Sequence, residues 1–189
     1  MNKPIGYEEV AAPGEFTPGE LGGHTAVIKG LEETTSKNGR PMIKVAIDFD
    51  EQDSQPGYFN DLFQSDDRPE KKWPFNAVQY ILTENPDGKC SRSFKSFISS
   101  VERSCGSECV WGNGFARWFI GKKVGVVYGI VEEEYNGNVT NRRRIRFFCQ
   151  YDKAKDAKVP EPKLLNNKPV PVNDGFMDIP DNMSGGVPF

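Results

Sequence analysis

Residues 33–50 read ETTSKNGRPMIKVAIDFD, and this stretch decides the fold class. After the turn letters SKNGR, the apolar residues Ile43, Val45 and Ile47 alternate with polar or small ones, which is the pattern of a half-buried strand. The Asn-Gly pair inside the turn supplies the positive φ angles that a tight hairpin requires. The stretch therefore predicts a β-hairpin whose first strand covers residues 24–33.

Further elements are predicted on the C-terminal side of this hairpin. Residues 57–63 (GYFNDLF) favour a third strand. Residues 77–84 (AVQYILTE) offer a further strand, because Tyr80 and Ile81 lie in a β-favouring run that is short for a helix, and the choice between strand and helix stays open. Residues 91–104 (SRSFKSFISSVERS) place apolar side chains at the helical spacing, with Ser91 or Ser93 as the cap.

Two more features complete the predicted domain. A short helix is expected over residues 113–119 (NGFARWF), capped by Asn113 and ended by Gly121. Residues 121–151 favour a long hairpin that turns at Asn136-Gly137.

The order of these elements is typical of an OB-fold. We predict a mainly β protein, an OB-fold-like five-stranded barrel with one main helix between strands 3 and 4. A two-layer α+β sandwich is the competing architecture.

Charge and composition divide the 189-residue chain into three parts. Residues 1–20 form an acidic N-terminal arm with a single base, Lys3, and residues 21–151 are expected to form the OB-fold-like domain. Residues 152–189 contain six prolines and no sustained apolar period, which predicts a flexible, disordered tail. No apolar run is long enough for a membrane span or a signal peptide, so we expect a cytoplasmic protein that does not enter membranes.

The overall charge of −3 gives no sign of nucleic-acid binding, but the local charge does. Residues 89–151 hold eleven bases against five acids, and Arg142, Arg144 and Arg146 alternate along the last predicted strand. A ladder of guanidinium groups on one strand face can follow a phosphate backbone. The alternative is that these arginines pair with Glu132–Glu134 across the same hairpin.

Aromatic rings are the second ingredient of a single-strand site, because nucleobases stack on them with little regard for sequence. Of 22 rings we assign several to the core, namely Phe49, Phe94, Phe97 and Phe147. Six others lie in or beside polar segments and are candidates for stacking: Tyr58, Trp73, Phe75, Tyr80, Trp111 and Tyr128. An OB-fold binds oligonucleotides over strands 2 and 3 and the loops joining strands 1–2 and 4–5. The residues that we expect to contact nucleic acid are Lys37, Arg40, Lys44, Tyr58, Trp73, Tyr128, Arg142, Arg144 and Arg146.

Catalytic and metal chemistry find little support in the sequence. The one histidine, His24, has no nucleophile arrangement around it and is expected at the surface. The spacing of the four cysteines does not favour a zinc site, so we expect reduced thiols and no cofactor. Asp48, Asp50 and Asp53 are interpreted as a solvated strand end; a metal-dependent nuclease built on Asp48 and Asp50 is a distant alternative.

The C-terminus resembles a peptide ligand. Residues 174–189 (DGFMDIPDNMSGGVPF) present Asp174, Asp178 and Asp181 and end in Pro188-Phe189 with a free carboxylate. An apolar pocket with a basic rim on a partner protein would accept such a segment.

These features together resemble single-stranded DNA-binding proteins encoded by bacteriophages. The tail DIPDNMSGGVPF is similar to the acidic tip ending in Pro-Phe by which bacterial and phage members recruit replication, recombination and repair proteins. The body, with ETTSKNGRPMIKVAIDF, FKSFISSVERS and GKKVGVVYG, resembles a phage group over most of residues 20–151. The acids of the tip are spread over eight positions here, so only Pro188, Phe189 and the aspartates carry over.

The sequence therefore predicts a non-catalytic protein that binds single-stranded DNA during phage DNA replication or recombination and recruits partners through its tail. The oligomeric state stays open, a homo-oligomer included. The alternative function is a β-barrel adaptor that binds only other proteins.

Overall fold

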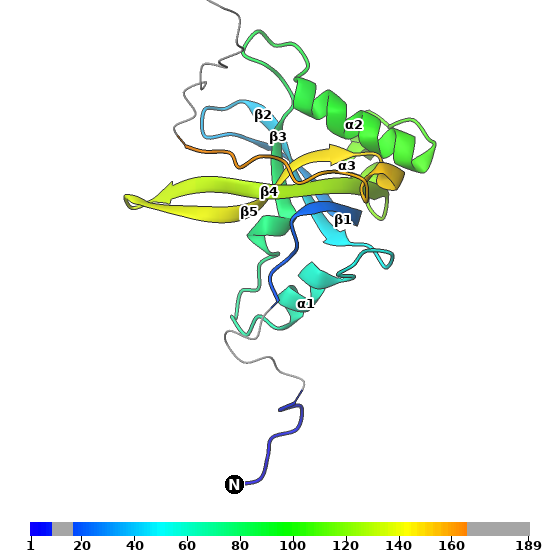
Figure 1. Cartoon of the computed structure of the whole chain (residues 1–189). Coiled ribbons are helices and arrows are strands. Elements are labelled where there is room, and N and C mark those ends of the chain that lie inside the picture. The colour runs from blue at the N-terminus through cyan, green and yellow to red at the C-terminus, as the bar shows by residue number, and fades with distance from the viewer. Residues whose placement is uncertain (9–16, 166–189) are drawn as a thin grey trace, which may run out of the picture.

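The protein is mainly β, with five antiparallel strands in one sheet (Figure 1). The computed structural model describes residues 1–8 and 17–165. The order across the sheet is β3-β2-β1-β4-β5. The strands are β1 (Gly22–Thr35), β2 (Pro41–Phe49), β3 (Val78–Leu82), β4 (Lys123–Tyr135) and β5 (Asn138–Cys149).

This strand order agrees with the predicted OB-like fold. The central strand β1 pairs with β2 on one side and β4 on the other, so β3 and β5 are the two edges of the sheet. The sheet curls without closing, and a seam remains between β3 and β5. The main helix α2 (Arg92–Cys105) lies between β3 and β4 in the chain, as predicted.

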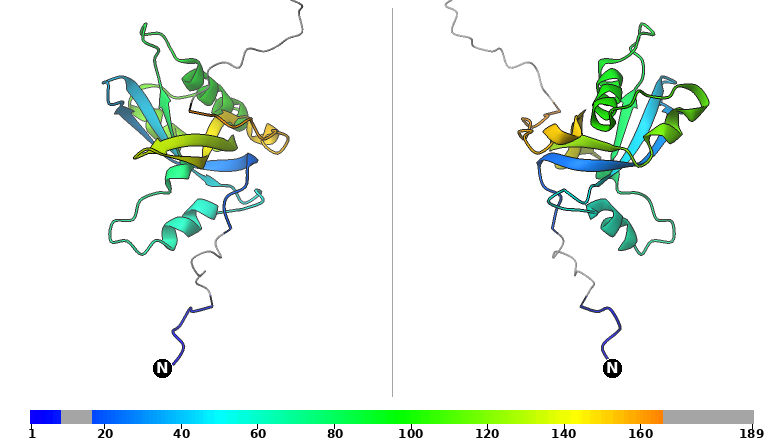
Figure 2. Two further views of the ribbon diagram at one scale, coloured as in Figure 1. Left: turned by 60° about the vertical axis from the view of Figure 1, so that its left-hand side comes forward. Right: turned by 90° about the vertical axis from the view of Figure 1, so that its right-hand side faces the viewer.

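Helix α2 closes one end of the curled sheet. Its apolar face buries Phe94, Phe97, Ile98 and Val101, and the helix contacts β3, β4 and β5. The Ser91 hydroxyl accepts a hydrogen bond from the Phe94 backbone N–H, which confirms the predicted cap. The short helices α1 (Tyr58–Gln64) and α3 (Phe115–Phe119) complete the fold, with α1 at the opposite end from α2 (Figure 2).

The predicted third strand over residues 57–63 is wrong, because these residues form α1. The buried Asp48 carboxylate accepts hydrogen bonds from the Phe59 and Asn60 backbone N–H groups at the start of this helix. Such a side chain satisfies helix donors that have no intrahelical partner. The third strand is β3, the run at residues 77–84 that the sequence left between strand and helix.

Two expected turn and cap details also differ. The β1–β2 loop is longer than a two-residue turn: the Ser36 backbone N–H bonds to the Arg40 carbonyl, and only Gly39 has a positive φ, 72°. Helix α3 has Gly114 at its N-cap without a side-chain hydrogen bond, so Asn113 is not its cap. In the β4–β5 hairpin both Asn136 and Gly137 have positive φ, as the sequence predicts.

A β-bulge changes which side chains of β5 face the core. Val127 is opposite Phe147 and Tyr128 is opposite Ile145, which leaves Arg146 as the extra residue. Phe148 is therefore buried and Phe147 is 47% exposed, so the assignment of Phe147 to the core is wrong.

The ordered domain extends beyond the boundary expected at residue 151. Residues 151–157 pack on β1 so closely that a Cβ at Gly23 would meet the Ala154 carbonyl oxygen at 1.7 Å. Farther on, Lys163 forms a parallel bridge with Val131 of β4. At the other end, Gly19 of the expected acidic arm bonds to Tyr58 and Arg143. The rest of the predicted flexible tail, residues 166–189, lies outside the described residues.

Among the described residues, no helix combines the length and the apolar character that a membrane crossing requires.

Candidate nucleic-acid interface

A groove of about 300 Å³ opens along the seam between β3 and β5. Val78 and Tyr80 line one wall, and Arg144 and Arg146 line the other. The groove exists because no strand bridges these two edges of the sheet. It combines exposed rings with cations, the two components of a single-strand site.

Phe75 and Arg144 form the centre of this groove. The Phe75 ring is 58% exposed, and the Arg144 guanidinium carbon lies 4.2 Å from the ring centroid. Arg144 also donates two hydrogen bonds to the Glu133 carboxylate, at 2.6 and 2.7 Å. Hydrogen bonding from Arg144 lowers the pKa of the Glu133 carboxyl below its usual value, so the acid is charged at neutral pH.

A second ring, Tyr80 on the groove wall, and a second cation, Lys44, lie together on the outer face of β2 and β3. Tyr80 is 44% exposed and pairs in register with Lys44, whose other neighbour in register is Glu32 of β1. The Lys44 ammonium lies 3.3 Å from the Glu32 carboxylate in an exposed ion pair. Exposed pairs of this kind contribute only about 0.2–1 kcal/mol, so Lys44 can exchange Glu32 for a phosphate.

The predicted ladder of three arginines is not present as a row of unpaired guanidinium groups. Arg146 is the bulged residue and donates to the Ile130 and Glu161 carbonyls, and Arg144 is held by Glu133. Arg142 is exposed and makes no side-chain hydrogen bond within residues 1–8 and 17–165. Of these three arginines, Arg144 is the one that hydrogen-bonds to an acid of the hairpin, as the alternative expected, while Arg142 interacts with Glu133 through charge without a hydrogen bond.

Lys37 and Arg40 lie on the β1–β2 loop, as predicted. Lys37 is exposed, while Arg40 donates a hydrogen bond to the Glu84 carbonyl, at 2.7 Å, in the loop that follows β3. The loop thus adds positive charge at the end of β3 that is nearer to α2.

The three rings in the set of expected nucleic-acid contacts, Tyr58, Trp73 and Tyr128, have structural roles. Tyr128 is 3% exposed and donates to the Asn76 carbonyl, so it cannot stack on a base. Burial raises the pKa of its hydroxyl well above the usual value. Tyr58 packs on Phe49 and accepts from the Gly19 backbone N–H, and Trp73 donates to the Ile47 carbonyl.

Phe75 and Tyr80 take the place of those three rings in the groove. The sequence singled out both rings as candidates but gave no reason to prefer them. For Tyr80 the missing information is its position opposite Lys44, which can be recognised only once the register of β3 is known.

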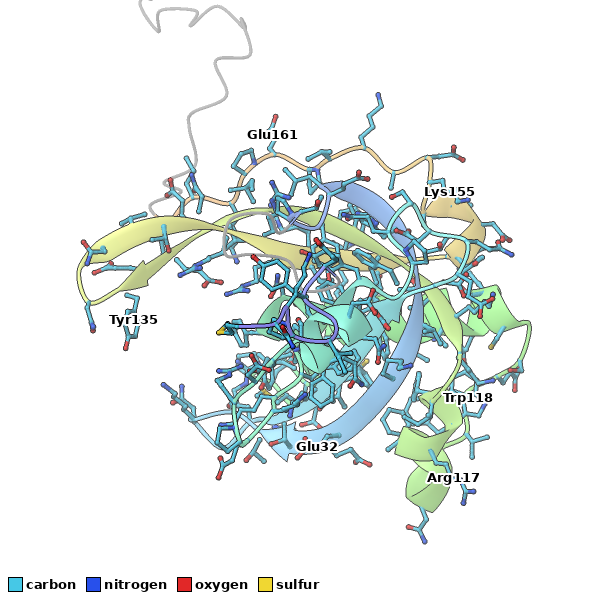
Figure 3. All side chains as sticks on the ribbon, turned by 90° about the horizontal axis from the view of Figure 1, so that it is seen from below. Glu32, Arg117, Trp118, Tyr135, Lys155 and Glu161 are labelled. Carbon is cyan, nitrogen blue, oxygen red and sulfur yellow. The ribbon has the colours of Figure 1, made fainter. Side chains whose placement is uncertain are left out.

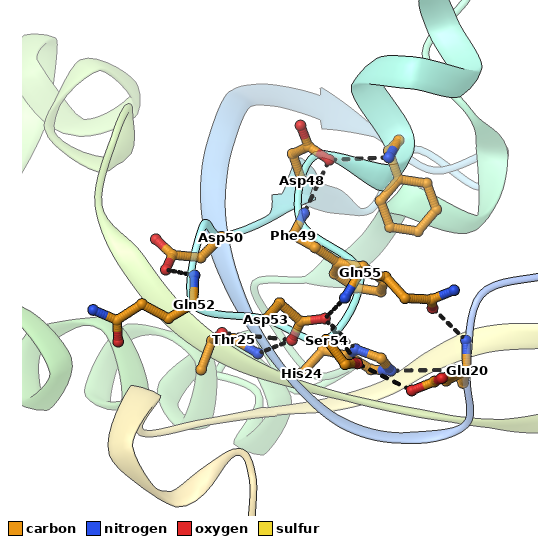
Figure 4. A network of polar contacts seen from close by, with 11 residues as sticks. Glu20, His24, Thr25, Asp48, Phe49, Asp50, Gln52, Asp53, Ser54 and Gln55 are labelled. Carbon is orange, nitrogen blue, oxygen red and sulfur yellow. Dashed lines mark hydrogen bonds and ion pairs between the residues drawn. The ribbon is translucent and has the colours of Figure 1, made fainter. Parts of the chain in front are cut away.

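His24 is buried, contrary to the prediction, and joins the N-terminal segment to the turn after β2 (Figure 4). Its Nδ1 lies 2.9 Å from the Asp53 carboxylate and its Nε2 lies 3.2 Å from the Glu20 carbonyl. Both ring nitrogens thus face oxygen atoms of neighbouring segments. Burial alone would raise the pKa of the Asp53 carboxyl, but hydrogen bonds from His24, Gln55 and Thr25 outweigh it and lower the pKa.

The aspartates after β2 are not the solvated strand end that the sequence suggested. Asp48 and Asp50 are 4% and 5% exposed. Asp50 accepts from the Tyr151 hydroxyl and pairs with Lys123 at 3.0 Å. These contacts tie α1 and residues 151–153 to the sheet, and they occupy the carboxylates that the nuclease alternative requires.

Within the described part of the chain, no cluster of three or more His, Cys, Asp or Glu side chains could hold a metal ion. The four cysteines are free thiols.

The expected partner-binding residues of the tail lie outside the described residues, and they are Asp174, Asp178, Asp181, Pro188 and Phe189.

No protein-family model matches the chain, and no curated protein matches it.

Proposed function

We propose that the protein binds single-stranded DNA without sequence specificity, through the groove between β3 and β5 and the adjoining outer face of β2 and β3. The observation that carries the proposal is the Phe75 ring beneath the Arg144 guanidinium, with the exposed Tyr80 ring on the same groove wall. Exposed rings beside cations suit a ligand that alternates flat bases with phosphates.

Each group has a distinct part in this binding. Bases stack on Phe75 and Tyr80, which gains about 1–3 kcal/mol for each base. Lys44, Arg142 and Arg144 bind phosphates and release the counterions that surround them. No bond is made or broken, so no catalytic residue and no cofactor is assigned. The bound strand is kept from reannealing and from nucleases.

The biological setting that we propose follows from the resemblance to phage single-stranded DNA-binding proteins. The protein acts in the cytoplasm of a host cell during DNA replication or recombination. The tail, with its aspartates and the terminal Pro188-Phe189, recruits other proteins of these processes.

The test is a fluorescence anisotropy titration of labelled oligo-dT, with a matched duplex for comparison. We expect binding of the single strand, and a loss of about fivefold or more in affinity for Phe75→Ala and for Tyr80→Ala. Trp111→Ala is the control, because Trp111 is 63% exposed but does not line the groove. No binding by the unaltered protein at low salt, or equal losses in all three variants, would reject the proposal.

One observation favours the adaptor as the second candidate. Arg144 and Arg146 already have partners in the protein, which reduces the positive potential of the groove. If the single strand does not bind, a pull-down with the full chain and with a chain lacking Phe189 tests the adaptor function.

A further inference from the structure

The seam between β3 and β5 leads from the groove at Phe75 to a second hollow along α2. At the far end of β3, the Leu82 carbonyl accepts a hydrogen bond from the Ser91 hydroxyl. At the far end of β5, the Phe148 carbonyl accepts one from the Ser100 hydroxyl, at 3.3 Å. Both serines line the second hollow, so the two hollows lie at opposite ends of one seam.

The second hollow, of about 740 Å³, is basic and hydroxylic. Arg92, Lys95 and Arg103 line it, together with the hydroxyls of Ser96 and Ser99. Residues 92, 95, 99 and 103 follow one another at spacings of three and four, which places them along one face of the helix. All three bases are exposed, and none forms an ion pair within residues 1–8 and 17–165.

We infer that this α2 groove is a second phosphate-binding site, which holds the part of a single strand that leaves the seam. The inference rests on the proposed function. The seam spans the five residues of β3, about 13 Å from Val78 to Leu82, and the basic stripe of α2 spans about 16 Å from Arg92 to Arg103. The combined path suits a strand within the range of about 4–16 nucleotides bound by one OB-fold.

A nucleic acid fits the α2 groove better than an acidic protein segment does. The hydroxyls of Ser96 and Ser99 add neutral donors between the cations, as in phosphate contacts. The groove also offers no exposed ring or apolar anchor of the kind that dominates protein interfaces. The groove at the other end of the seam holds Phe75 and Tyr80, which supply the stacking part of the same ligand.

The test compares two oligo-dT lengths, about 3 and about 12 nucleotides, because the seam of about 13 Å holds only about two to three nucleotides of an extended strand and the longer oligonucleotide alone reaches α2. The variant carries Arg92→Gln, Lys95→Gln and Arg103→Gln in the full chain. The control removes the same charge from three residues of β1, α3 and the segment before β4 that do not line the α2 groove: Lys29→Gln, Arg117→Gln and Lys122→Gln. Figure 3 shows Arg117 far from Tyr135 at the tip of the β4–β5 hairpin.

We expect the α2 variant to bind the longer strand about tenfold or more weakly, while the shorter strand binds as before. For the longer strand, the slope of log affinity against log salt concentration should become shallower by about 2, because three cations no longer contact phosphates. The control should change both lengths equally and little. Unchanged binding of the longer strand would overturn the inference and leave the charge of α2 to a protein partner. Equal losses for both lengths would overturn it as well. Failure of the proposed function is distinguishable, because the unaltered protein would then bind neither strand.

Discussion

The Glu133–Arg144 pair predicts a variant that binds DNA more tightly than the natural protein. In Glu133→Gln the two charge-assisted hydrogen bonds to Arg144 are lost, and the guanidinium becomes available to a phosphate. The side chains are 17% exposed for Arg144 and 37% exposed for Glu133, so solvent screens the pair in part. We place its net free energy near the upper end of the range for surface pairs, about 1 kcal/mol. Binding that no longer breaks this pair should be about fivefold tighter.

Anisotropy titrations at several salt concentrations measure both the affinity and its dependence on salt. The affinity should rise at each salt concentration while the slope of log affinity against log salt stays the same, because Arg144 neutralises one phosphate in both proteins. Glu134→Gln is the matched control, because it removes the same charge from an exposed side chain that does not line the groove. Equal affinities for the natural protein and Glu133→Gln would show that Arg144 does not reach the strand. Equal gains in both variants would show a bulk charge effect.

Three further predictions concern the contacts that support the site. Asp53→Asn should lower the free energy of unfolding by about 1–3 kcal/mol in urea titrations, because His24 and the backbone N–H groups of Thr25 and Gln55 lose a carboxylate partner; an unchanged free energy of unfolding would contradict this role of Asp53. The folded-state pKa of Asp53 is lowered, so the stability from this group is present above its unfolded pKa of about 3.9 and is lost as the pH falls through the folded value. Thermal melts should show that acid loss in the natural protein and a much smaller one in Asp53→Asn. Gly23→Ala should destabilise the fold by about 2 kcal/mol or more, because its Cβ would lie 1.7 Å from the Ala154 carbonyl oxygen. Gly39→Ala is the control, because its Cβ would meet no atom within 4 Å and the change should cost only the strain of its positive φ. Comparable melting temperatures for these two variants would contradict the docking of residues 151–157 on β1.

The elements predicted correctly from sequence are those whose signals are local. The alternation at residues 43–49, the helical spacing at Phe94 and Phe97, and the Asn136-Gly137 turn each lie within one element. The β5 bulge could not be predicted in this way, because Ile145 and Phe147 continue an unbroken alternation. What decides it is a distant contact: the Phe148 ring packs on Phe97 of α2 at 4.8 Å between centroids.

The polar network was missed for the same physical reason. His24 and Asp53 are 29 residues apart, and neither position has a local signal of burial. Asp48 sits at the end of a strand where the sequence suggests solvent, yet its carboxylate serves the first turn of α1. The helix at residues 58–64 therefore depends on a residue outside itself, and the β-favouring composition of that run gave the wrong prediction.

The open seam itself argues for an anionic ligand over an added protein strand. Exposed sheet edges invite pairing with other chains, and charged side chains along an edge oppose it. Here Arg144, Arg146 and Lys163 line the seam, so an incoming strand would have to bury their charges against its own backbone. A polyanion meets no such penalty, because its phosphates replace the carboxylate at Arg144 and its bases cover the ring of Phe75. Cations along this edge therefore favour an anionic occupant over a further strand.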